Sequence, residues 1–186
     1  MPSSTSFKKL LFTASDLDNE YSDCMFVNCT FNELHLGKIN FDRCTFMQCN
    51  LSLCKMKATA WCDVKFLDCK MTGIEFTNCN NYTLSLSFSQ CNLQYATFRG
   101  LNLQGTQFEG CQMQGADFSE ANLKSAFFNN CDLATAIFSK TNLEKADFST
   151  AFNFDINPVY NKLRQAIFSR SGLEGLLSDF EVIVVD

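Results

Sequence analysis

The chain has 186 residues, of which 46% are hydrophobic and 19% charged, so it can bury a core and does not belong to the disordered class. The formal net charge of −5 argues against direct binding to a nucleic-acid backbone, which needs a strongly basic surface. No apolar stretch approaches the ~18 residues of a membrane span or the ~7 of a signal peptide core. These features favour a protein of the reducing cytoplasm that contacts neither membrane nor nucleic acid.

Residues 1–20 carry a weak repeat. Phe7, Phe12 and Leu17 are five residues apart, in a frame of their own. We interpret this segment as an imperfect first coil of a repetitive fold. Between Lys38 and Lys70 basic residues predominate locally, although the protein as a whole is acidic.

A period of five runs through residues 21–157. Every fifth residue is large and apolar in two runs, which are separated by a slip of two residues within 79–87. The first run is Phe26, Phe31, Leu36, Phe41, Phe46, Leu51, Met56, Trp61, Phe66, Met71 and Phe76. The second is Phe88, Leu93, Phe98, Leu103, Phe108, Met113, Phe118, Leu123, Phe128, Leu133, Phe138, Leu143 and Phe148. Neither a helix of period 3.6 nor a strand of period 2 explains this spacing, so the chain must turn a corner in every unit.

The position two residues before most central residues holds a small or modest side chain, mostly Cys, Ala or Thr. Ten of the 11 cysteines lie there when Cys79, two residues before position 81 of the continued first frame, is included, and Cys62 is the exception. Their spacing of five differs from the C-x₂-C spacing of zinc sites, and the odd number argues against a complete disulfide framework. We therefore interpret the cysteines as small core residues, and we expect neither metal nor cofactor.

The alternation of Phe with Leu or Met after Phe88 predicts the stacking. If four units form one square coil, residues twenty apart lie above one another. Phe88, Phe108, Phe128 and Phe148 would then form one column, and Leu103, Leu123 and Leu143 another. Like residues would stack at the ~4.8 Å spacing of parallel strands.

Three copies of the pattern A-[DN]-[LF] make a family resemblance visible: Ala116-Asp117-Phe118, Ala121-Asn122-Leu123 and Ala146-Asp147-Phe148. The chain resembles the pentapeptide-repeat family over roughly residues 20–157. That resemblance implies an all-β fold, a right-handed quadrilateral parallel β-helix.

Residues 158–186 depart from the repeat after Pro158, which cannot donate a ladder hydrogen bond. The pattern predicts a short helix over 172–180 with Ser171 as its N-cap, followed by a strand over 181–186. An apolar face on this segment would either fold over the last coil or meet a second copy in a dimer. The candidate dimer residues are Leu173, Leu176, Leu177, Phe180, Val182 and Ile183.

This C-terminal end, from Asp155-Ile156-Asn157-Pro158 to Leu176-Leu177, also resembles the topoisomerase-protecting branch of the family. That branch includes the Qnr quinolone-resistance proteins and the microcin and albicidin immunity proteins. The resemblance implies a homodimeric rod that imitates DNA in width and acidity. Such a rod binds DNA gyrase or topoisomerase IV and protects the enzyme from poisons, which confers antibiotic resistance or self-immunity.

Catalysis is not expected, because His35 is the one histidine and the sequence contains no Gly-rich phosphate loop. The alternative function is a scaffold or regulatory adaptor for another protein. A continuous acidic stripe and a dimer would favour the topoisomerase hypothesis, whereas a monomer without such a stripe would favour the adaptor. The slip at Asn80, Asn81 and Tyr82 is either a bulged corner or a bump that contacts the partner.

Overall fold

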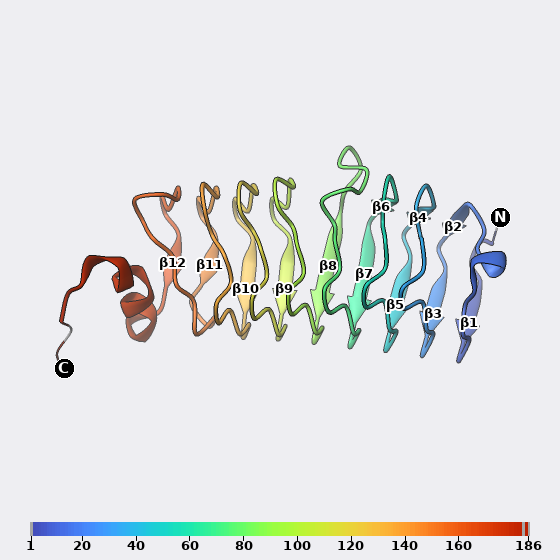
Figure 1. Cartoon of the computed structure of the whole chain (residues 1–186), viewed down its shortest axis with the longest axis horizontal. Coiled ribbons are helices and arrows are strands. Elements are labelled where there is room, and N and C mark those ends of the chain that lie inside the picture. Colours follow the sequence, from blue (N-terminus) through green and yellow to red (C-terminus); the bar gives the residue numbers. More distant parts are fainter. Residues whose placement is uncertain (1, 184, 186) are drawn as a thin grey trace.

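Each five-residue unit turns one corner, and four units close one coil of a parallel β-solenoid (Figure 1). The computed structural model describes residues 2–183 and 185. Neighbouring strands pair in parallel with a register of twenty residues, as in Phe108↔Phe128. The fold class and the stacking period predicted from the sequence are confirmed.

One side of the solenoid, which we name the broad sheet face, carries a parallel sheet of nine strands in the order β1-β3-β5-β7-β8-β9-β10-β11-β12. The strands are β1 (Ser6–Lys8), β3 (Met25–Val27), β5 (Thr45–Met47), β7 (Val64–Leu67), β8 (Leu86–Ser89), β9 (Gln107–Glu109), β10 (Phe127–Asn129), β11 (Asp147–Phe148) and β12 (Ile167–Phe168). In Figure 1 they follow one another along the length of the rod.

An adjacent side, which we name the asparagine face, begins with the three-stranded sheet β2 (Glu20–Ser22), β4 (Asn40–Asp42) and β6 (Ala60–Cys62). Beyond the frame slip it continues as single β-bridges through Asn102, Asn122, Asn142 and Lys162. The Asn102, Asn122 and Asn142 side chains form a ladder. Asn122 Nδ2 donates to Asn102 Oδ1, and Asn142 Nδ2 donates to Asn122 Oδ1, each at 2.9 Å.

Beyond the frame slip, aromatic rings form two columns of the core. Phe98 and Phe118 stack with ring centroids 5.0 Å apart, while Phe108 of the neighbouring column meets Phe118 edge-on at 6.0 Å. Stacked and edge-to-face pairs each add about 0.5–1.5 kcal/mol to the burial of the rings. The predicted Phe88–Phe108–Phe128–Phe148 stack is confirmed, with neighbouring centroids 5.2, 5.0 and 4.7 Å apart.

Corners are made by residues with positive φ, two positions after each central residue. Asn28 has φ 54° and Asn130 has φ 53°, and Gly100 has φ 69°. The left-handed region costs most non-glycine residues about 1–2 kcal/mol. Backbone hydrogen bonds hold these corners in place, as when Asn28 N donates to Met47 O at 2.9 Å. The repeat therefore needs few glycines.

The first coil joins the same core. Phe7 stacks on Phe26 at 4.9 Å, and Phe12 stacks on Phe31 at 4.5 Å. The register here is nineteen residues, as in Phe7↔Phe26, which accounts for the separate frame of this segment. A 3-10 turn, η1 (Ala14–Asp16), follows.

The frame slip is a two-residue insertion. β7 pairs with β8 with Phe66↔Phe88, a register of twenty-two instead of twenty. The extra residues leave the coil as a loop that projects above the rod between β6 and β8 (Figure 1). Stacking in the core continues across the insertion, because Phe66 and Phe88 lie 5.3 Å apart.

The C-terminal segment differs from the prediction. Two 3-10 helices, η2 (Arg170–Leu176) and η3 (Ser178–Phe180), replace the expected helix over 172–180. The N-cap is Ser169, whose hydroxyl accepts from Gly172 N, and not Ser171. Residues 181–183 and 185 form no strand, and the rest of the predicted strand lies outside the described residues. A strand needs a neighbouring strand with which its backbone can pair. At this end of the rod the 3-10 helix η2, and not a further strand, lies beyond β12 (Figure 1).

The cysteines lie as small core residues. Cys49, Cys69 and Cys91 donate their thiols to carbonyl oxygens of neighbouring coils at 3.3–3.4 Å. All 11 are free, and Cys62 and Cys79 are the two that are not fully buried. Burial raises the pKa of Cys54 to about 12, so that about one thiol in ten thousand is ionised at pH 8.

We therefore expect the native protein at pH 8 to react with a thiol reagent such as DTNB at Cys62, and only slowly at Cys79. Unfolding in guanidinium should expose all 11 thiols. The reaction is followed by absorbance, and Cys62→Ser should remove the fast phase. Rapid native reaction of more than two thiols would show that the core opens readily.

Candidate interaction surfaces

The loop at residues 80–85 is held by its own asparagines. Asn80 Oδ1 accepts from Tyr82 N at 3.1 Å, and Asn81 Oδ1 accepts from Asn102 N in the next coil at 3.4 Å. The Asn81 side chain thus links the two halves of the asparagine face, where the backbone ladder is interrupted. Leu84 packs partly buried against the core and anchors the other end of the loop.

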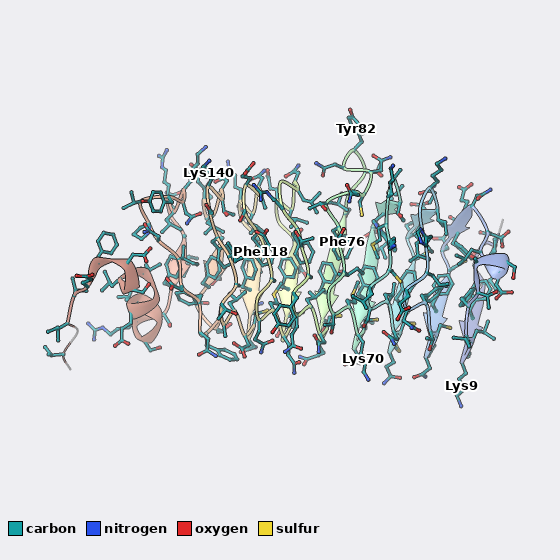
Figure 2. The ribbon with its side chains drawn as sticks, viewed as in Figure 1. Lys9, Lys70, Phe76, Tyr82, Phe118 and Lys140 are labelled. Atoms are coloured by element: carbon teal, nitrogen blue, oxygen red, sulfur yellow. The ribbon has the colours of Figure 1, made fainter. Side chains whose placement is uncertain are left out.

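Tyr82 lies at the tip of this loop and is 99% exposed. Figure 2 shows its ring projecting away from the rod. A fully exposed aromatic side chain on an ordered loop is a typical anchor for a partner pocket, because Tyr and Trp dominate binding energies at interfaces. The residues predicted as a possible contact therefore form one projecting unit.

A second candidate surface covers the C-terminal end. Leu173, Leu177 and Phe180 are exposed, and Ile183 is 91% exposed. Val182 is also exposed. Leu176 is different, because it is partly buried and packs against the core. Five of the six predicted dimer residues are thus available to a partner, while Leu176 belongs to the cap of the rod.

The cap is docked on the last coil through glycines. A Cβ atom on Gly175 would lie 2.2 Å from Phe154 O, and one on Gly172 would lie 2.7 Å from the Phe154 ring. Gly175 O also accepts from Ile156 N at 2.8 Å. This close approach fixes the direction in which η2 presents Leu173 and Leu177.

The structure adds apolar residues to this surface that the sequence analysis did not single out. Each lies at an outward position near the end of the rod, where most units carry a polar residue. They are Phe152, Val159, Tyr160 and Ile167, with exposures from 47% to 69%. An apolar residue at an outward position of the five-residue frame is the signal by which they could have been found.

Charge divides the asparagine face into two halves. Toward the N-terminus it carries Glu20, Asp23, Asp42 and Asp63, with Arg43 bound to Asp23 at 2.8 Å and to Asp42 at 2.6 Å. Toward the C-terminus it carries Lys124, Lys145, Lys162 and Arg164 against one carboxylate, Glu144, and at the corner where the chain enters this face Lys140 follows Glu120 of the preceding coil. Of these cations, only Lys124 has an ion pair within the described residues, with Glu144 at 3.9 Å.

The described surface offers little for catalysis. His35 is exposed and forms a bridge pair with Lys55 on another side of the rod. One open groove follows a corner of the N-terminal half and is lined by polar side chains such as Asn28, Gln48 and Lys70. Within the described residues no three His, Cys, Asp or Glu side chains come together to hold a metal ion.

The family model described as the pentapeptide repeat region matches residues 19–98 and 82–176. The chain belongs to the pentapeptide-repeat family. Solenoids of this family are generally not enzymes. No curated protein sequence matches the chain closely enough to count as a relative.

Among solved structures, this pentapeptide-repeat protein is similar to QnrB1, described as a plasmid-mediated fluoroquinolone resistance protein. One trypsin-treated form of QnrB1 has a TM-score of 0.60 at 15% identity, and the match covers 99% of both chains. A second trypsin-treated form has a TM-score of 0.61 at 15% identity, covering 98% of this chain and 99% of QnrB1. Full-length QnrB1 has a TM-score of 0.52 at 18% identity, covering 97% and 99%.

At these identities the similarity establishes the fold along the whole chain, from the first coil to the cap. Among the described residues, no helix has the length and apolar character needed to cross a lipid bilayer.

Proposed function

We propose that this pentapeptide-repeat protein binds a type II topoisomerase, DNA gyrase or topoisomerase IV, and protects it from topoisomerase poisons. The observation that carries the proposal is the likeness to QnrB1, a fluoroquinolone resistance protein, which extends over 99% of both chains and includes the C-terminal end. A protein that resists such drugs without a catalytic centre acts by binding. The rod has two surfaces suited to that role, the Tyr82 loop and the C-terminal end.

Dimerisation is the second part of the proposal. The exposed apolar residues gather in the last coil and cap, with Leu173, Leu177, Phe180 and Ile183 at its end. An apolar surface of this kind on a soluble rod is typical of a protein interface. A twofold contact between two caps would cover it and give a rod of twice the length.

DNA mimicry in its simplest form requires an acidic stripe along the rod. On the asparagine face acidic side chains predominate as far as Asp63, and beyond the Tyr82 loop the basic side chains outnumber Glu120 and Glu144. We therefore confine a DNA-like surface to the N-terminal half of this face. The interrupted stripe favours the second candidate function, an adaptor for another protein, which pull-down followed by mass spectrometry would test.

The experiment that tests the main proposal is gyrase supercoiling and DNA cleavage with a poison, either a quinolone, albicidin or a microcin. The protein should restore supercoiling and reduce trapped breaks. A loop variant tests the contact: residues 81–85 are replaced by the three residues that occupy these places one coil later, Leu103-Gln104-Gly105. This variant should restore the regular coil and need about tenfold more protein for the same protection, since it lacks the aromatic anchor.

Tyr82→Ala should show most of the loss seen in the loop variant, and Tyr95→Ala serves as the control because Tyr95 is also exposed, at 69%, on a regular coil. Circular dichroism should show all three variants folded. Absence of protection against every poison, with no binding to either topoisomerase, would refute the proposal and leave the adaptor function.

A further inference from the structure

The two halves of the asparagine face lie on one continuous strip. Bridges connect Glu20, Asn40, Ala60 and Asn80 in the N-terminal half, and Asn102, Asn122, Asn142 and Lys162 in the C-terminal half. The bond from Asn102 N to Asn81 Oδ1 joins them. Seven steps of ~4.8 Å place the ends of the strip about 34 Å apart, several times the Debye length at physiological salt. Each half therefore presents its own sign to a partner.

Four of the five cations of the basic half have no ion pair within the described residues. Lys140, Lys145, Lys162 and Arg164 are exposed and have no ion pair among the residues that the structure describes. Backbone bonds set them in two adjacent coils: Lys145 N donates to Arg164 O at 3.0 Å, and Leu143 N donates to Lys162 O at 2.9 Å. The main-chain ladder thus fixes their positions.

Basic residues neutralise part of the acidic half, but its net charge stays negative. Arg43 holds Asp23 and Asp42, whereas Glu20 and Asp63 have no ion pair within the described part of the chain. Lys38 lies at the corner where the chain enters this half. The hydrogen bond and charge of Arg43 hold the pKa of Asp23 below its ordinary value, so this carboxylate stays ionised down to acidic pH.

The Tyr82 loop stands between the two halves. Figure 2 shows Tyr82 and Lys140 projecting from the same edge of the rod, with Lys9 and Lys70 on the opposite edge. From this arrangement we infer that the asparagine face is a bipolar docking surface for a protein, and that its opposite charges fix the direction in which the rod binds.

The partner surface must carry a pocket for the Tyr82 ring, acidic residues opposite the basic half and basic residues opposite the acidic half. A uniform polyanion such as DNA fits less well, because along this strip it would meet the acidic half with repulsion. A protein surface can carry both signs, and such complementarity sets orientation and association rate. This inference rests on the proposed function, since the partner used to test it is gyrase.

The test is binding of the full-length protein to immobilised gyrase holoenzyme at physiological and at low salt. The basic-half variant combines Lys140→Gln, Lys145→Gln, Lys162→Gln and Arg164→Gln. Its matched control combines Lys55→Gln, Lys57→Gln, Lys65→Gln and Lys70→Gln, which remove the same charge from exposed positions on the other sides of the rod. The basic-half variant should bind about tenfold more weakly or worse, mostly through slower association, and the control should stay within about twofold.

A third variant, Glu20→Lys with Asp63→Lys, separates a protein partner from a polyanion. A complementary protein surface predicts weaker binding to gyrase, and little binding of the wild type to a short DNA duplex. Tighter binding of this variant to gyrase, or tight binding of the wild type to the duplex, would overturn the bipolar surface. Equal binding of the basic-half variant and wild type would also overturn it while leaving topoisomerase binding intact. If the wild type does not bind gyrase, the proposed function fails, and this inference fails with it.

Discussion

Replacing Phe118 by alanine should lower the free energy of unfolding by about 3–5 kcal/mol. The Phe118 ring is fully buried, stacks between Phe98 at 5.0 Å and Phe138 at 5.2 Å, and meets Phe128 edge-on at 5.8 Å. The cavity cannot collapse easily, because hydrogen bonds between coils hold the backbone, as when Phe118 N donates to Ile137 O at 2.9 Å. Both the lost transfer energy and the cavity therefore contribute.

Urea denaturation followed by circular dichroism measures this change. Phe127→Ala is the control: Phe127 is 40% exposed on β10, and its truncation should cost less than about 1 kcal/mol. Similar losses for the two variants would contradict the assignment of inward and outward positions in the five-residue frame.

Introducing charges at the C-terminal end should convert the proposed dimer to a monomer. Leu177→Glu with Phe180→Glu places two carboxylates on exposed apolar positions of the cap and changes no contact of the stacked core. If these residues meet their copies across a twofold axis, each charge is buried near its own image, so the dimer should weaken by about 100-fold or more.

Light scattering during gel filtration gives the mass of each variant. Leu11→Glu with Phe127→Glu is the matched control, because both residues are exposed, large and apolar but lie away from the cap. The control should stay dimeric. A wild-type monomer of about 21 kDa at micromolar concentration would contradict the proposed dimer.

The solenoid could be predicted from the sequence because one physical constraint repeats in every unit. A large residue at each fifth position must point into the core, and the alternation of Phe with Leu or Met fits a coil of four units with like residues twenty apart. The two-residue slip was visible for the same reason: Phe66 and Phe88 must share a column, so the surplus residues have to leave the coil.

The cap could not be predicted in the same way, because its conformation depends on contacts that are distant in sequence. Apolar spacing over 172–180 indicates a helix, but the segment forms 3-10 turns and packs closely on the last coil, where Gly175 meets Phe154. Leu176 was placed with the exposed dimer residues for the same reason, although it packs inward. The bipolar face is not apparent along the linear sequence, because its charges come from residues that are distant in the chain. Sorted into columns by coil, Asp23 and Asp63 fall in the same corner column as Lys145, with the acidic residues at one end and the lysine at the other.

The coil of four units has a consequence for how such a protein can change length during evolution. Duplicating or deleting twenty residues lengthens or shortens the rod by one step and leaves every column in phase. An insertion of five residues would preserve the local pattern but rotate everything after it by a quarter turn. The angle between the Tyr82 loop and the C-terminal cap is therefore kept only when whole coils are gained or lost. If both surfaces contact the partner, insertions and deletions of twenty residues are the ones that evolution can tolerate.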